Sequence, residues 1–355
     1  MKNFIFILFL LISFSTNAYS NINKHLLNEM FTTLNNKYLE PINNENLIST
    51  GLSALNDIDK NITISKGNTR FYIYFDRQIY KAVAFPQDRN DINGWVDTTS
   101  AIIEAASEKS AEISLKDFQI PDLIMKKMAL VLDKYSRYFS EYEYHEEENN
   151  NTIYTLYSDR IIDDILYIRL RIFNKQTEKA VKKSLNDNTD VKGVIIDLRG
   201  NSGGMFNEAL KVAGLFIDNA IITYTAGRNN SNIHYYTSKD NTIYDGPLII
   251  LVDGKTASAA EVLAGGLQEQ SRAKIIGTRT FGKGTIQNII QMSNKGKLVL
   301  TTEQFYTPSG KVIHKHGIIP DICLEKDNNN NCIKNSRLHN DEDIDTAIKI
   351  LKNEF

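Results

Sequence analysis

Two serines occupy turns that could present a nucleophile. Ser202 is the central residue of GNSGG (200–204), a G-x-S-x-G pattern between the apolar run VIIDL and a segment with helical spacing. On a strand-to-helix turn, this pattern is the signature of a hydrolase nucleophile elbow. Such a serine needs an acid and a histidine further along the chain. The histidines that follow Ser202 are His234, His314, His316 and His339, and none stands in a catalytic-looking context.

The other serine, Ser258, begins a helix of small residues after a buried strand, in PLIILVDGKTASAAEVLAGG (247–266). The first N–H groups of a helix favour developing negative charge, and the neighbouring alanines leave room for a polypeptide. The alternative is that Ser258 only caps the helix. Lys283, flanked by two glycines, offers a base, because burial depresses the pKa of a lysine and leaves an amine that can accept a proton. Lys255 is a rival base that we expect to be exposed.

Several motifs, in their order along the chain, resemble the carboxyl-terminal processing proteases, also called tail-specific proteases, of peptidase family S41. The matching stretches are LDKYSRYF (132–139), DLRGNSGG (197–204), TASAAE, TFGKG, GTIQ, TEQFYTPSG (302–310) and HGIIPDI (316–322). The resemblance implies that Ser258 is the nucleophile and Lys283 the general base. It also implies that Gln287 positions the lysine.

The same resemblance makes the glycine-rich turn an oxyanion hole. Carried over, the donors are the N–H of Gly204 or Gly203 and that of Ala259, next to the nucleophile. The chemistry suits the residues, because glycine lets the backbone approach a substrate and N–H groups stabilise a tetrahedral intermediate. Ser202 is then a turn residue. We expect Asp197 and Arg199 to hold the turn.

The apolar pattern divides the chain into four parts. Residues 1–18 have the features of a secretory signal peptide, with cleavage after residue 18 or 20, because the apolar run after Lys2 is too short to span a bilayer. Residues 19–145 predict a mainly helical N-terminal domain with a strand pair near 71–86. Residues 153–325 alternate short β-branched runs with helical segments, and 326–355 predict a loop and a helix.

This alternation predicts the α/β class, with βα units and mostly parallel strands. The resemblance implies a ClpP/crotonase-like βα core. In the last helix, Ile344, Ala347, Ile348 and Leu351 should share one buried face. Cys323 and Cys332 flank a polar loop and are either a disulfide or two free thiols.

Charge and composition bound the partners. The net charge of -2 gives no electrostatic footprint for nucleic acid, and no later segment predicts a stable membrane span. No metal and no organic cofactor is implied. We expect a secreted serine endopeptidase of the periplasm or cell envelope that acts on polypeptides, near their C-terminus, through an acyl-enzyme.

One departure from the family affects substrate recognition. Most members carry a PDZ domain after the first motif, but here about 25 residues separate Phe139 from Leu166. A PDZ domain binds a peptide C-terminus by adding a strand to a sheet edge. An adaptor protein in its place is therefore an expected partner. The alternatives are a catalytically inactive peptide- or ligand-binding protein on the same scaffold, and an esterase that uses Ser202 with a histidine.

Overall fold

The chain, in a computed structural model that describes residues 24–143, 157–239, 242–337 and 340–353, divides into two units. The first unit comprises the residues up to 147 together with 287–302, and the second comprises 148–286 and 303–355. The predicted core domain, 153–325, includes 287–302, but Met292, Leu298 and Leu300 complete the apolar core of the first unit. The predicted signal peptide lies outside the described residues.

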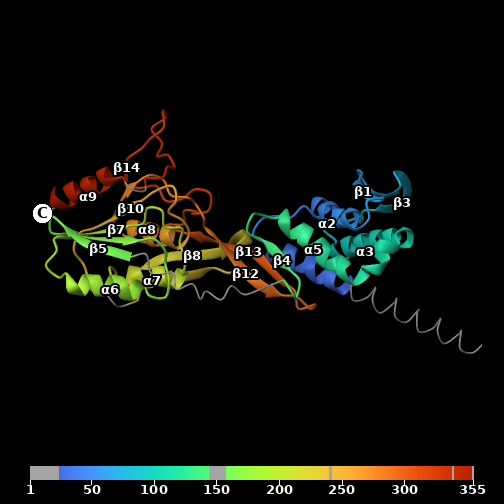
Figure 1. Cartoon of the computed structure of the whole chain (residues 1–355), viewed down its shortest axis with the longest axis horizontal. Helices are drawn as coiled ribbons and strands as arrows, with labels where there is room; N and C mark the ends of the chain where they lie inside the picture. The colour runs from blue at the N-terminus through green and yellow to red at the C-terminus, as the bar shows by residue number, and fades with distance from the viewer. Residues whose placement is uncertain (1–23, 144–156, 240–241, 338–339, 354–355) are drawn as a thin grey trace, which may run out of the picture. The chain divides into compact units, whose positions relative to one another are not determined.

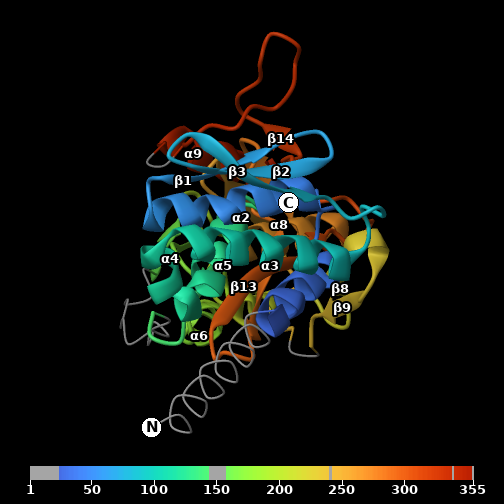
Figure 2. The ribbon, with the colours of Figure 1, turned by 90° about the vertical axis from the view of Figure 1, so that its right-hand side faces the viewer.

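Helices make up most of the first unit, as the spacing of its apolar residues predicts. Residues 24–37 are helical, and α2 (Asn44–Ile58), α3 (Ile92–Lys109), α4 (Ala111–Leu115), the 3-10 turn η1 (Asp117–Gln119) and α5 (Ile120–Leu130) follow. A three-stranded antiparallel sheet packs beside α2 (Figure 2). Its strands are β1 (Ile62–Lys66), β2 (Arg70–Phe75) and β3 (Gln78–Ala84), of which only β2 and β3 were predicted.

The D-x-x-S part of LDKYSRYF holds the segment 287–302 in this unit. Asp133 Oδ2 accepts the hydroxyl of Ser136 at 2.8 Å, and Asp133 Oδ1 accepts the Ser136 N–H at 2.8 Å. The buried Ser136 hydroxyl then accepts the N–H of Thr301 at 3.1 Å. After this turn, β4 (Arg137–Phe139) pairs antiparallel with the first residues of β13 (Lys297–Tyr306).

A six-stranded sheet forms the centre of the second unit. Its order is β14-β11-β10-β7-β6-β5, and all neighbouring strands are parallel except β5, which is antiparallel to β6. This confirms the predicted α/β class with mostly parallel strands. The strands are β5 (Tyr157–Ile162), β6 (Ile165–Leu170), β7 (Gly193–Asp197), β10 (Leu248–Val252), β11 (Lys274–Gly277) and β14 (Ile322–Cys323).

Helices cover both faces of this sheet (Figure 1). Side chains alternate along each buried strand, so Val194 and Ile196 face α6 (Thr177–Asp187), α7 (Phe206–Gly214) and α8 (Ala259–Glu269). Ile195, between them, faces α9 (Asp341–Asn353) on the other side. The predicted apolar face of the last helix is confirmed, because its four residues are buried there.

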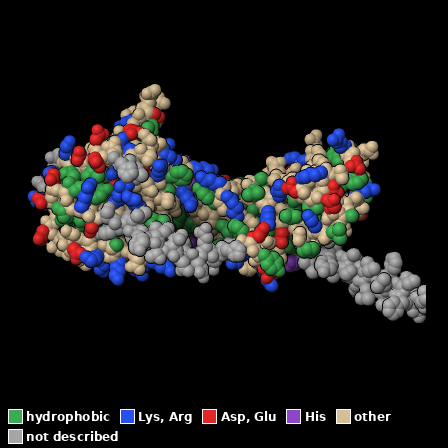
Figure 3. All heavy atoms as spheres, viewed as in Figure 1, with side chains coloured by type: hydrophobic (Ala, Val, Ile, Leu, Met, Phe, Trp, Pro, Cys, Tyr) green, Lys and Arg blue, Asp and Glu red, His purple; other side chains and the backbone are tan. Residues whose placement is uncertain are grey.

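The remaining strands of the second unit form an antiparallel group. The last residues of β13 pair with β8 (Ile221–Gly227), and β8 pairs with β9 (His234–Thr237). The 3-10 turn η2 (Arg228–Asn230) follows β8, and β12 (Thr285–Gln291) precedes β13. No helix within the described ranges is long and apolar enough to cross a membrane. Acidic and basic side chains are interspersed on the face in Figure 3.

Cys323 and Cys332 are joined in a disulfide, with their Cα atoms 5.8 Å apart. The bridge connects the end of β14 to the segment that leads into α9. Of the two alternatives that the sequence left open, the structure therefore selects the disulfide.

Replacing both cysteines by serine should lower the free energy of unfolding of the second unit by about 2–3 kcal/mol, because the unfolded chain regains the entropy of an open loop. Denaturant unfolding followed by circular dichroism without reductant measures this change. Wild type in excess dithiothreitol should match the double variant. Equal free energies for oxidised wild type and the double variant would contradict the prediction.

Candidate active site

Three turns at the carboxyl ends of neighbouring strands carry the candidate residues. We call them the glycine turn (198–204, after β7), the serine turn (253–258, after β10) and the lysine loop (278–283, after β11). Because β7, β10 and β11 are adjacent and parallel, all three turns emerge at the same edge of the sheet, where α/β proteins bind their ligands.

The glycine turn packs directly against Ser258. A Cβ atom on Gly203 would lie 2.7 Å from the Cβ of Ser258 and 3.1 Å from the backbone nitrogen of Ala259. A Cβ atom on Gly204 would lie 2.2 Å from the carbonyl oxygen of Phe173. Both glycines have positive φ angles, +103° and +122°. Only glycine fits this approach, so the two residues are fixed by backbone conformation as well as by space.

The main-chain N–H groups of this turn differ in their partners. The N–H of Gly203 donates to Asn201 Oδ1 at 2.8 Å, which makes it a structural group. Within the described part of the chain, the N–H groups of Gly204 and Ala259 are not seen to donate to a protein acceptor. Of the expected oxyanion donors, these two therefore have no acceptor among the described residues and can donate to a substrate.

Ser258 has a strained backbone. Its φ and ψ are 57° and -123°, a conformation that non-glycine residues rarely adopt, and α8 begins at the next residue. Strain of this kind persists only when the surroundings hold it, and it concentrates at functional sites. Ser202 lies exposed on the glycine turn, and its φ angle is not positive. The strained, helix-starting serine is thus Ser258.

A buried carboxylate, that of Glu261, joins the serine turn to the lysine loop. Its Oε2 accepts the N–H of Ser258 at 2.9 Å and the N–H of Lys283 at 2.8 Å. Its Oε1 accepts the N–H of Gly282 at 2.6 Å and the hydroxyl of Thr280. Burial raises the pKa of Glu261, and these four hydrogen bonds oppose that shift. One side chain thus fixes the main chain at both candidate catalytic residues.

Glu261 was not singled out from the sequence. Its signal was present, because a serine followed three residues later by glutamate is the capping-box pattern of a helix start. The contacts to Thr280 and Gly282 could not be predicted, since they join residues 19 and 21 positions away.

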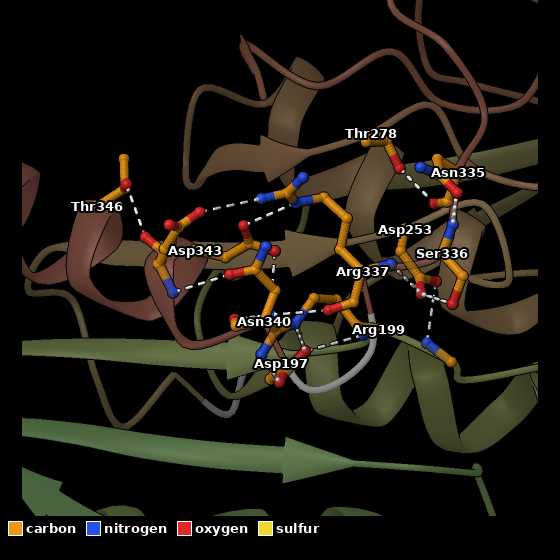
Figure 4. Close-up of polar contacts among 12 residues, drawn as sticks. Asp197, Arg199, Asp253, Thr278, Asn335, Ser336, Arg337, Asn340, Asp343 and Thr346 are labelled. Carbon is orange, nitrogen blue, oxygen red and sulfur yellow. Dashed lines mark hydrogen bonds and ion pairs between the residues drawn. The ribbon is translucent and has the colours of Figure 1, made fainter. Parts of the chain in front are cut away.

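The glycine turn is also held by buried charges, as expected for Asp197 and Arg199. Asp197 accepts Arg199 Nε at 2.9 Å and Nη2 at 2.7 Å, and it accepts the Tyr167 hydroxyl at 2.6 Å. Burial and the neighbouring carboxylate of Asp197 raise the pKa of Tyr167. Burial lowers the pKa of Arg199, but its ion pairs outweigh that effect and raise it. Figure 4 shows this pair together with residues of the C-terminal segment.

The other sequence candidates lie in different surroundings. Lys283 is partly buried at the end of the lysine loop, whereas Lys255 is exposed, as expected. Gln287 belongs to the first unit, where its Nε2 donates to Thr301 Oγ1 at 3.1 Å. His234 lies on β9, and His314 and His316 lie between β13 and β14. His339 is outside the described residues.

No group of three or more His, Cys, Asp and Glu side chains in the described ranges could hold a metal ion.

Substituting Glu261 by glutamine should slow covalent labelling of Ser258 by a fluorophosphonate roughly 10–100-fold, because an amide cannot accept from all four donors and charged hydrogen bonds are worth about 1.5–3 kcal/mol. Labelling rates are followed by intact-protein mass spectrometry. Glu269→Gln, at the other end of α8, is the matched control and should label at the wild-type rate. Wild-type labelling of Glu261→Gln would show that the carboxylate does not set this geometry.

Comparison with known proteins gives one consistent family. Residues 164–324 match peptidase family S41. The carboxy-terminal-processing protease of Bartonella bacilliformis is 40% identical over 174 residues, 47% of this chain and 40% of that protein. The carboxyl-terminal-processing protease of Synechocystis is 37% identical over 162 residues, 45% of this chain and 38% of that protein. The chain thus spans about two fifths of the length of these relatives.

A solved structure extends the similarity of fold to most of the chain. A lipoprotein from Streptococcus agalactiae superposes with a TM-score of 0.51 and 18% identity, over 90% of this chain and 100% of that one. At this identity the likeness concerns the fold alone. The match to peptidase family S41 covers residues 164–324, which contain all three turns of the candidate site. Residues 164–324 of this chain thus match peptidase family S41 and are similar in sequence to the two carboxyl-terminal-processing proteases.

Proposed function

We propose that this protein is a serine endopeptidase of the C-terminal processing type, in which Ser258 is the nucleophile and Lys283 the general base. One observation carries the proposal: Glu261 Oε2 accepts hydrogen bonds from the main-chain N–H groups of both Ser258 and Lys283. This buried oxygen atom therefore holds the main chain of Ser258 close to that of Lys283. The glycine turn packs on the same serine.

The proposed reaction is acyl transfer to Ser258. Its Oγ attacks the carbonyl carbon of a peptide bond as Lys283 Nζ takes the hydroxyl proton. The N–H groups of Gly204 and Ala259 stabilise the oxyanion, and each such donor typically contributes about 10²–10³ in rate. The proton passes to the leaving amine as the C–N bond breaks. Water then hydrolyses the ester and restores both groups. The role of Gln287 stays a prediction from sequence.

The proposed substrates are polypeptides, cut near their C-terminus, in the periplasm or cell envelope. The printed names of the aligned relatives, carboxy-terminal-processing proteases, support the substrate class. The Cys323–Cys332 disulfide supports an exported protein, because disulfides persist in oxidising compartments. An adaptor protein that presents the substrate remains part of this proposal.

Cleavage of an unfolded protein with an apolar C-terminal tail tests the assignment. The full chain is expressed in an exporting host, and wild type is compared with Ser258→Ala, Lys283→Ala and Ser202→Ala. Loss of the nucleophile or base should reduce the rate by at least about 10³-fold, because the remaining groups only bind and polarise the substrate. Ser202→Ala should retain activity and serves as the control.

The other outcomes are equally distinct. Loss of cleavage only in Ser202→Ala would replace the proposal with a nucleophile elbow and a histidine base. No cleavage by wild type, with or without a lysate that supplies an adaptor, would favour the inactive binding protein.

The pH dependence of cleavage identifies the base. A lysine must lose its proton before it can act, so log(kcat/KM) should rise into the alkaline range and stay high there. A histidine base would instead place the midpoint of the rise near about 6.5. Initial rates between pH 5 and 10 measure the profile, and circular dichroism at each pH confirms that the protein stays folded. A plateau reached by pH 7 would contradict a lysine base.

A further inference from the structure

The segment after the disulfide contacts all three turns of the candidate site. We call residues 333–337 and 340–343 the C-terminal strap. At the lysine loop, the carbonyl of Ile333 accepts the N–H of Arg279 at 2.9 Å, and that of Asn335 accepts the hydroxyl of Thr278 at 2.7 Å. At the serine turn, Asn335 also accepts the N–H of Gly254 at 2.6 Å. Figure 4 shows the contact between Asn335 and Thr278.

Asp253 connects the strap to two turns at once. Its Oδ1 accepts the N–H of Gly200 at 2.9 Å and that of Thr256 at 3.0 Å, which joins the glycine turn to the serine turn. Its Oδ2 accepts the N–H of Arg337 at 3.2 Å. Asp253 is fully buried. The Asp253 carboxylate therefore links the strap, the glycine turn and the serine turn.

Arg199 connects the glycine turn to the strap. Its Nη1 donates to Asp343 Oδ2 at 3.0 Å and to the carbonyl of Asn340 at 2.6 Å. The side chain of Arg199 is 2% exposed and that of Asp343 is 0% exposed. Asp343 Oδ1 accepts Nε of Arg337 at 2.8 Å, so the carboxylate links two arginines. Without the Asp343 charge, Arg199 Nη1 and Arg337 Nε each lose a buried carboxylate partner, and breaking a buried ion pair is strongly destabilising.

Arg199 is next to Gly200 and lies five residues before the proposed oxyanion donor Gly204. The N–H of Gly200 donates to Asp253, so a shift of the main chain at Arg199 would also displace Asp253 and the serine turn. The glycine turn also carries the carbonyl of Asn201, which accepts the N–H of Ala257 at 2.9 Å. A displacement at the strap would thus be transmitted to the glycine turn and the serine turn through the hydrogen bonds at Gly200 and Ala257.

We propose that Asp343 is a positioning residue which, through Arg199, sets the glycine turn and the serine turn in their reactive arrangement. The hydrogen bonds given above connect the strap to Arg199, Asp253, Gly254, Thr278 and Arg279, and none of these is a proposed reacting group. The kinetic part of this inference rests on the proposed function, whereas its structural part does not.

Asp343→Asn is the test variant, because it keeps the shape of the side chain and removes one of the two carboxylate charges that Arg199 binds. Asp341→Asn is the matched control, since it removes an exposed carboxylate from the same first turn of α9. Arg337→Gln is a second variant, for which a milder effect is expected because Asp343 keeps Arg199. All are assayed as full chains, below the unfolding midpoint that circular dichroism gives for each.

The kinetic readout is kcat per active site, with the sites counted by fluorophosphonate titration of Ser258. A residue that only stabilises the fold would change the number of titrated sites and leave kcat per site unchanged. Positioning predicts that Asp343→Asn lowers kcat per site about 10–100-fold, as misplacement by about 1 Å does, and changes KM by less than about 3-fold. Arg337→Gln should lower it about 3–10-fold, and Asp341→Asn should match wild type.

The structural readout is amide hydrogen exchange followed by mass spectrometry, in peptides that cover 199–205 and 253–259. Asp343→Asn should exchange at least about 10-fold faster there, while Asp341→Asn should not. An unchanged kcat per site in Asp343→Asn overturns the proposal. If wild type does not cleave, the proposed function fails and exchange alone decides. Faster exchange at the two turns then supports the strap, and unchanged exchange overturns it.

Discussion

The hydrogen bonds that converge on the Glu261 carboxylate set the arrangement of the site. Burying a carboxylate is costly, and four donors offset that cost. Two of these donors belong to the strained Ser258 and to Lys283, so the strain of the serine backbone is held by a group that also fixes the lysine loop.

Around this centre the second unit uses the parallel sheet as a frame. Adjacent strands end at one edge, and polar side chains from each turn bond to the main chain of the next. Asp253 bonds to the glycine turn, Thr256 Oγ1 donates to the carbonyl of Leu198 at 2.8 Å, and Glu261 bonds to the lysine loop. The strands β7, β10 and β11 carry the three turns, and the C-terminal strap forms hydrogen bonds with these turns.

Local pattern was sufficient for most elements of the fold. The alternation of β-branched runs and helical segments predicted β6, β7, β10 and β11 with their helices, because each signal lies within one short stretch. Ser258 and the glycine turn also stood out locally, through small residues at a strand-to-helix junction. The partners of Arg199 did not, because Asp343 is 144 residues away and looks like any acidic residue at a helix start. The packing of 287–302 was equally hidden, since a β-hairpin with one apolar face does not reveal which core it joins.

That hairpin has a consequence for how the chain can be divided. The polypeptide enters the first unit, leaves it, and returns for residues 287–302 before finishing in the second. A fragment that begins at residue 148 would therefore carry Met292, Leu298 and Leu300 without the core that covers them, and it would tend to aggregate. The two units are thus not separable modules in sequence. Removal of the N-terminal region would therefore require a compensating change within residues 287–302, in the middle of the segment that matches peptidase family S41.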